Sequence, residues 1–227
     1  MTEPMTGPPV PPDEMDDEEF YRWYGAWDPL DPPGVAALMA GFDRPWWIVG
    51  GWAIDAFTGV PREHEDVDLT ILSCDIPALR EHLGDEWTPW SNHGGTIRPL
   101  NDRFPDALER GSQIWIRRDS ASPWVVDVPL TPDRDGLWTN KRWPEHVVPV
   151  EDATWVAADG IRYANPEIVL HYKARSQRPK DDRDLDLSWP LLSTGQQEWL
   201  LHAIRATEGD EHPWLGRHGT PAADPAS

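Results

Sequence analysis

Two aspartates separated by one residue, Asp66 and Asp68, stand in a segment that otherwise has the residue types of a β-strand. Aspartate is a poor strand former, so folding alone does not account for the pair. Residues two apart on a strand point to the same face, so the two carboxylates project together while Val67 and Leu69 face the core. Side-by-side carboxylates repel each other unless a cation lies between them, and Mg²⁺ prefers such oxygen ligands. The pair is therefore a candidate metal site, although charges on a strand edge also discourage aggregation.

A third acid, Asp127, interrupts the apolar run WVVDVPL at residues 124–130. Burying an unpaired charge is costly, so this carboxylate needs a partner. A strand carrying Asp127 beside Asp66 and Asp68 would complete a three-carboxylate metal site. Two metal ions about 3.5–4 Å apart can activate an attacking hydroxyl and stabilise a leaving pyrophosphate.

A pair of glycines, Gly50 and Gly51, joins the apolar run WWIV to the segment WAIDAF, which we expect to be helical. Glycines at a strand-to-helix turn let backbone N–H groups approach a phosphate closely, and the helix N-terminus adds a favourable potential. An ordinary tight turn is the alternative interpretation.

The elements that must position these residues alternate between short apolar runs and amphipathic segments. We expect strands at 46–49, 66–72, 112–118 and 124–130, and a hairpin at 155–163 that turns at Asp159-Gly160. Helices are expected at 31–41, 52–58 and 76–83, and then from Asn165, over 179–192 and from Thr194. The pattern predicts an α/β (α+β) fold with a mixed central sheet flanked by helices, plus a small C-terminal helical domain.

The chain divides by composition into four parts. Residues 1–16 are rich in proline and acid and are expected to be disordered, as are residues 208–227. Between them we expect an α/β domain at 17–163, which holds the candidate metal site, and a helical domain at 164–207. The segment rich in proline and tryptophan at 129–155 matches no pattern that we can place.

The combined pattern resembles the nucleotidyltransferase superfamily, and within it the aminoglycoside 2''-adenylyltransferase and lincosamide nucleotidyltransferase branch. Asp127 matches the third superfamily aspartate by its setting, and PEIVLHYKARSQRPKDDRDLDL resembles the C-terminal helical motif of the branch. The chain departs from the family in having Val49 where a third glycine is frequent. The N-terminal motif of the branch has three consecutive elements: G-G-W-x-x-D, then a glycine, then R-x-H-x-D-x-D-L. In this chain its residues are Gly50, Gly51, Trp52, Asp55, Gly59, Arg62, His64, Asp66, Asp68 and Leu69.

The resemblance implies Mg²⁺-dependent transfer of AMP from ATP to a hydroxyl of a small molecule, such as an aminoglycoside. It implies that the two glycines hold the phosphates of the nucleotide and that the three aspartates hold the metal. It places Arg62 and His64 near the active site, where a guanidinium suits phosphate oxygens and the histidine either contacts phosphate or anchors the loop. For Lys173, a contact with the triphosphate and a solvated lysine both remain open. At the start of the next helix, Lys180 and Asp181 favour a capping role.

The formal charge of −20, from 40 acidic and 20 basic residues, narrows the choice of partner. It disfavours nucleic acid and fits a cationic acceptor, although solubility alone also explains an acidic surface. The lone cysteine, Cys74, fits a reducing cytoplasm, and no run approaches the length of about 20 apolar residues that spans a membrane. Two alternatives stay open: a nucleotidyltransferase toxin that modifies tRNA or protein, and a non-catalytic nucleotide-binding scaffold.

Fifteen tryptophans are unusually many for this length. Those in apolar runs are expected in the core, and those in loops are candidates for lining a substrate cleft. His171 is expected to make a local hydrogen bond rather than to bind a ligand. The expected core residues are Trp46, Trp47, Trp115 and Trp124, and the expected cleft residues are Trp87, Trp90, Trp138 and Trp143.

Overall fold

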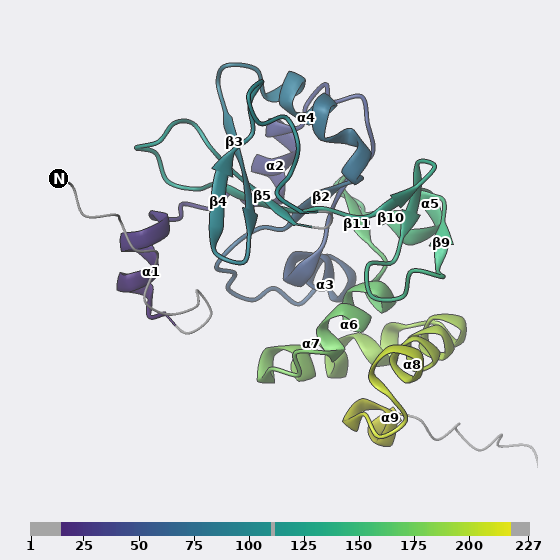
Figure 1. Ribbon diagram of the computed structural model, residues 1–227. Helices are drawn as coiled ribbons and strands as arrows, with labels where there is room; N and C mark the ends of the chain where they lie inside the picture. Colours follow the sequence, from purple (N-terminus) through teal and green to yellow (C-terminus); the bar gives the residue numbers. More distant parts are fainter. Residues whose placement is uncertain (1–14, 110–111, 219–227) are drawn as a thin grey trace, which may run out of the picture. The chain divides into compact units, whose positions relative to one another are not determined.

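The structure is a computed structural model that describes residues 15–109 and 112–218 (Figure 1). The chain folds into two compact units, each made of two separate stretches. Among the described residues, unit 1 consists of those up to Trp46 together with those from His64 to Gly136, and unit 2 of Trp47–Glu63 together with those from Leu137 onward. Unit 2 thus joins the C-terminal helices to segments that the sequence prediction assigned to the domain at 17–163.

Unit 1 is built on an antiparallel β-sheet of order β4-β3-β5-β6. Strand β2 lies beside β6, and isolated parallel bridges join Asp68 to Asp127 and Leu72 to Thr131; the N–H of Thr131 donates to the carbonyl oxygen of Ile71 at 3.0 Å. The strands are β2 (Leu69–Ile71), β3 (Thr88–His93), β4 (Thr96–Pro99), β5 (Gln113–Arg117), β6 (Val126–Pro129) and the short β7 (Asp133–Arg134).

Alternate residues of the unit 1 sheet face a closely packed aliphatic core. Ile114, Ile116, Val126 and Val128 are fully buried, as the two-residue period of a strand requires. Helix α4 packs against β3, and its Leu79 is fully buried. The helices of unit 1 are α1 (Asp17–Tyr24), α2 (Pro32–Leu38), the short η2 (Ser73–Asp75) and α4 (Ile76–Leu83).

Helix α1 packs on an aromatic cluster at the other set of alternating positions, and the sequence analysis did not predict this helix. The side chain of Asp16 caps it by accepting from the N–H of Glu19 at 2.8 Å. The core of the cluster is Tyr24, Trp115 and Trp124. The predicted burial of Trp115 and Trp124 is confirmed. Partly buried members around them are Met15, Phe20, Trp23, Trp27, Trp90 and Ile97.

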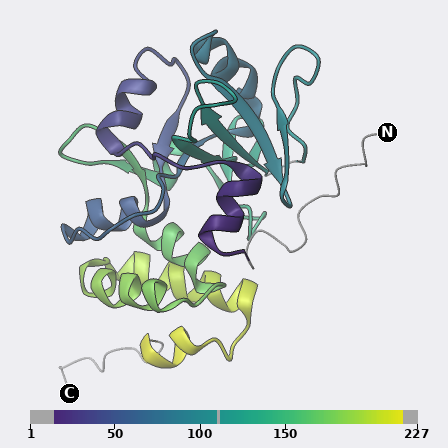
Figure 2. The ribbon, with the colours of Figure 1, turned by 90° about the vertical axis from the view of Figure 1, so that its left-hand side faces the viewer.

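Unit 2 combines a small sheet with a group of helices. Strand β11 pairs parallel with β1 and antiparallel with β10, and β8 pairs antiparallel with β9. Helix α6 packs against α8, and both belong to the group of green to yellow-green helices in Figure 2. Helix α3 contacts both α6 and α7. The elements are β1 (Trp46–Ile48), α3 (Gly50–Thr58), β8 (Leu137–Thr139), β9 (Val147–Val148), α5 (Val150–Ala153), β10 (Thr154–Val156), β11 (Arg162–Ala164), α6 (Pro166–Ala174), α7 (Pro179–Ser188), η3 (Trp189–Leu191), α8 (Thr194–Glu208) and α9 (Pro213–His218).

The predicted mixed α/β class is confirmed, and several details differ from the sequence prediction. The hairpin that turns at Asp159-Gly160 is present as β10 and β11. The prediction of disorder from residue 208 is wrong as far as residue 218, because α9 forms there and Trp214 is only 1% exposed. The predictions for residues 1–14 and 219–227 fall outside the described residues. Within the described part, no helix is long and apolar enough to cross a membrane.

Candidate functional site

The acidic part of the candidate site lies at the junction of β2 and β6 in unit 1. Asp68 is the parallel register partner of Asp127, so their side chains project from the same face of neighbouring strands. Asp127 is buried, with 6% of its surface exposed, while Asp68 is half-buried and Asp66 is exposed. Val67 and Leu69, which alternate with the aspartates, are fully buried. The predicted burial of Val67 and Leu69 is therefore confirmed, but the predicted strand over 66–72 is shorter in the structure, because β2 begins at Leu69 and Asp66 precedes it.

The row of side chains on this face continues across the sheet. Trp115 in β5 is the register partner of Asp127, and Trp90 in β3 is the partner of Trp115. Gln113, two residues before Trp115, donates from Nε2 to Oδ2 of Asp127 at 2.9 Å. Sequence analysis missed Gln113, although the two-residue period from Trp115 places it on the same face.

The backbones of Asp68 and Asp127 are paired, but in the described part of the chain their side chains are not arranged with a third ligand around one point, as in a metal-binding cluster. Within residues 15–109 and 112–218, no three His, Cys, Asp or Glu side chains form a group that could hold a metal ion. Binding of Mg²⁺ by Asp66, Asp68 and Asp127 therefore stays a prediction.

The glycine turn lies in unit 2, where α3 begins at Gly50 rather than at Trp52. Gly50 has φ +70°, a backbone conformation that favours glycine. The N-cap residue, Val49, makes no side-chain capping hydrogen bond, so the cap does not occupy the first N–H groups of the helix. This arrangement is suited to an anion, and phosphate binding by Gly50 and Gly51 stays a prediction.

The loop after α3 is held by Arg62. Its backbone N–H donates to Oδ2 of Asp55 at 2.9 Å, which ties the loop to α3. Its guanidinium Nε lies 3.6 Å from Oδ1 of Asp184 in α7, and its Nη1 donates to the carbonyl oxygen of Glu63 at 2.9 Å. The predicted contact of Arg62 with phosphate is not tested by these contacts. The same holds for His64, which is half-buried at the start of the unit 1 stretch.

Lys173 is buried in unit 2, with 8% of its surface exposed, so its interpretation as a solvated lysine is wrong. Its ammonium lies 3.1 Å from Oδ1 of Asp181 and 2.8 Å from Oδ2 of Asp184. Burial alone would raise the pKa of Asp181, but hydrogen bonds from Arg178 and the charge of Lys173 outweigh it and lower that pKa. A contact of Lys173 with the triphosphate stays a prediction. Asp184 lies within the C-terminal motif PEIVLHYKARSQRPKDDRDLDL, but its ion pairs could not be derived from the sequence.

His171 is fully buried in α6 and has the structural role expected from the sequence. Its Nε2 lies 3.0 Å from Oγ1 of Thr207, and its Nδ1 lies 3.3 Å from Nδ2 of Asn140. Burial, together with the charges of Arg142 and His146, lowers the pKa of His171 to about 4. The imidazole is therefore neutral near pH 7.

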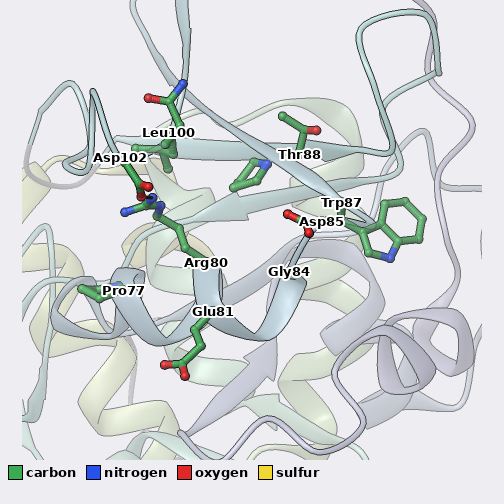
Figure 3. Close-up of a pocket in the computed structure, with 11 residues that line it drawn as sticks. Pro77, Arg80, Glu81, Gly84, Asp85, Trp87, Thr88, Leu100 and Asp102 are labelled. Carbon is green, nitrogen blue, oxygen red and sulfur yellow. Dashed lines mark hydrogen bonds and ion pairs between the residues drawn. The ribbon is translucent and has the colours of Figure 1, made fainter.

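A pocket of about 590 Å³ opens beside α4 in unit 1, and Figure 3 shows the residues that line it. Trp87 is at its wall, and Arg80 pairs with Asp102 at 2.9 Å. The prediction that Trp87 lines a substrate cleft stays a prediction. Trp90 instead joins the aromatic cluster, and Trp138 is buried in β8, so the prediction that these two line a cleft is wrong. None of the three aspartates of the acidic site lines this pocket.

The region around the two glycines and the first two aspartates is similar in sequence to known proteins. Residues 34–88 match the sequence model of the family aminoglycoside-2''-adenylyltransferase. A 2''-aminoglycoside nucleotidyltransferase from Klebsiella pneumoniae is 39% identical over 67 residues, which are 26% of this chain and 38% of that protein. This chain thus matches little more than a third of the length of its curated relative.

Three solved structures show a distant overall likeness. The solution structure of the antibiotic-resistance factor ANT(2'')-Ia aligns at 20% identity over 82% of this chain and 92% of that one, with a TM-score of 0.47. The crystal structure of ANT(2'')-Ia with adenylyl-2''-tobramycin aligns at 20% identity over 76% and 93%, with a TM-score of 0.48. The lincomycin-bound lincosamide adenylyltransferase LnuA aligns at 18% identity over 67% and 90%, with a TM-score of 0.46. The resemblance drawn from the motifs is confirmed directly for residues 34–88, which include Gly50, Gly51, Asp66 and Asp68.

Proposed function

We propose that this protein is a Mg²⁺-dependent nucleotidyltransferase that moves AMP from ATP to a hydroxyl of a small cationic molecule of the aminoglycoside class. The observation that carries the proposal is the register of Asp68 with Asp127, because it places a third carboxylate beside a D-x-D pair that lies inside the family match. The likeness of that segment to aminoglycoside-2''-adenylyltransferases supports the choice of reaction.

The acidic face supplies the ligands. Asp66, Asp68 and Asp127 would hold Mg²⁺, which suits their hard oxygen atoms; Asp68 and Asp127 are register partners, and Asp66 precedes Asp68 by two residues. When bound, the metal neutralises charge on the phosphates and on the reacting oxygens.

Asp127 is the proposed general base. In the reaction the acceptor oxygen bonds to the α-phosphorus, the bond from that phosphorus to the bridging oxygen breaks, and pyrophosphate leaves. The hydroxyl proton moves to the carboxylate of Asp127. Gln113 keeps one oxygen of this carboxylate in place through its 2.9 Å hydrogen bond, which fixes the direction of the other oxygen.

Other residues are proposed to bind the nucleotide. Gly50 and Gly51 supply the N–H groups at the start of α3 to phosphate oxygens. His64 comes from the loop that leads to the acidic strand, whereas Arg62 and Lys173 are both paired with Asp184 in unit 2. The net charge of −20 favours a cationic acceptor over tRNA. ATP as the donor and the single cysteine fit a cytoplasmic enzyme.

The proposal is tested by measuring pyrophosphate release from Mg²⁺ and ATP with aminoglycosides, lincosamides, tRNA or cell extract as acceptor. We expect release with at least one aminoglycoside, and we expect Asp68→Asn to abolish it without unfolding the protein. Release with tRNA alone would replace this function by nucleic-acid modification. ATP binding without release in any arm would favour a non-catalytic scaffold.

A further inference from the structure

Five charged side chains in unit 2 form a connected network, and three of them are buried. Lys173 lies within 3.1 Å of oxygen atoms of both Asp181 and Asp184, and these three residues are between 0% and 8% exposed. Arg178 pairs with Asp181 at 2.9 Å, and Arg62 pairs with the second oxygen of Asp184 at 3.6 Å. Lys173 and Arg62 therefore share one carboxylate, that of Asp184.

This network holds a loop as well as three helices. Arg62 follows α3, Lys173 is in α6, and Asp184 is in α7. The backbone of Arg62 is tied to Asp55 in α3, while its guanidinium is tied to α7. Arg62 is consequently fixed at two points that are independent of each other.

The position of Arg62 in the chain makes this anchoring relevant to the acidic site. Only three residues lie between Arg62 and Asp66, so a change at Arg62 reaches the metal-binding segment through a short covalent path. A carboxylate ligand must be held closely to its productive geometry, and neighbouring residues commonly supply that constraint.

We propose that Asp184 is a positioning residue: held by Lys173, it clamps Arg62 and thereby orders the segment that leads into Asp66 and Asp68. This inference rests on the proposed function only for its effect on turnover. Asp184 and Lys173 then act through Arg62 and do not touch the substrate.

The competing interpretation is that Arg62 contacts phosphate directly. The two roles differ in the absence of nucleotide, because a clamp orders the loop before any substrate binds, whereas a phosphate ligand need not. Hydrogen–deuterium exchange of the amides of residues 59–66, measured without substrate, separates them. This measurement also stands if the proposed function fails.

The variants are Arg62→Gln, Asp184→Asn and their combination, with Asp186→Asn as the matched control. Asp186 lies on the same helix and pairs with Arg217 at 2.9 Å, but both side chains of that pair are well exposed. Arg62→Gln leaves Asp184 paired with Lys173, so it decides the question even if Asp184→Asn does not fold.

If Asp184 clamps Arg62, the amide hydrogens of residues 59–66 should exchange about tenfold faster in both single variants than in the wild type. A tenfold change corresponds to a contribution of about 1.4 kcal/mol. The control variant should exchange at the wild-type rate. The double variant should exchange no faster than the more affected single variant, because both changes break the same contact. Turnover should fall in Arg62→Gln, with Mg·ATP affinity within about twofold of wild type. Unchanged exchange in both single variants would overturn the proposal, as would a loss of Mg·ATP affinity in Arg62→Gln with unchanged exchange.

Discussion

Acidification should destabilise this protein through His171, which is fully buried and neutral in the folded state. Its pKa is about 4 in the folded protein, lowered first by burial and then by Arg142 and His146, against an ordinary value of 6.5. Between pH 6.5 and 4 the unfolded chain therefore binds a proton that the folded protein does not. By linkage, stability is fully present above pH 6.5 and is lost as the pH falls toward 4.

The size of this loss follows from the difference in pKa. About 2.5 units at about 1.36 kcal/mol each give roughly 3 kcal/mol, a large part of the stability of an average domain. The measurement is urea unfolding of the wild type and of His171→Gln at several pH values between 7.5 and 4. Glutamine can keep hydrogen bonds to Asn140 and Thr207 but carries no titrating group.

The difference in unfolding free energy between the two proteins gives the contribution of His171 to the pH dependence of stability, because the other titrating groups are common to both. We expect the wild type to lose about 3 kcal/mol more than the variant between pH 7 and pH 4. Parallel pH profiles for the two proteins would refute the reasoning.

Four further predictions follow from individual contacts. Lys173→Met should destabilise the protein by about 3–5 kcal/mol in urea unfolding, because it leaves Asp181 and Asp184 buried without their ammonium partner; a loss below about 1 kcal/mol would show that the network is solvated. Trp124→Ala should cost about 3–5 kcal/mol, because the indole is fully buried in the aromatic cluster, and an unchanged urea midpoint would contradict that packing. Gln113→Ala should lower turnover more than Mg·ATP affinity, and equal effects on both would argue against a role in orienting Asp127. Asp66→Asn should abolish transfer without lowering the thermal stability of the metal-free protein, and a large fall in stability would point to a structural role.

The parts of the site that sequence could predict are those set by local periodicity. The alternation of Asp66, Val67, Asp68 and Leu69 predicts that Val67 and Leu69 face the core, and both are fully buried in the structure, although β2 begins only at Leu69. The pairing of that segment with Asp127 was inferred from the cost of a lone buried acid, and the parallel register agrees.

The parts that sequence could not predict depend on contacts between distant segments. Asp184 and Arg62 are 122 positions apart, and nothing in either local pattern indicates that they meet. Helix α1 lies in an acidic stretch that resembles a disordered terminus, and its burial depends on Trp115, far along the chain. The same holds for α9: the Nε2 of His212, the residue just before this helix, lies 2.8 Å from the carbonyl oxygen of Ala174.

The central claim is that the acids on one face of the unit 1 sheet carry nucleotidyl transfer, and Asp127→Asn tests it most directly. Mg·ATP affinity by calorimetry and pyrophosphate release with a reactive aminoglycoside should be measured on the same preparation of this variant. We expect release to fall by about a hundredfold or more while affinity changes far less, because Asp66, Asp68 and the two glycines would still hold Mg·ATP, whereas a general base acts only in the transition state. Release close to the wild-type rate would contradict the assignment of Asp127 and, with it, this account of the site.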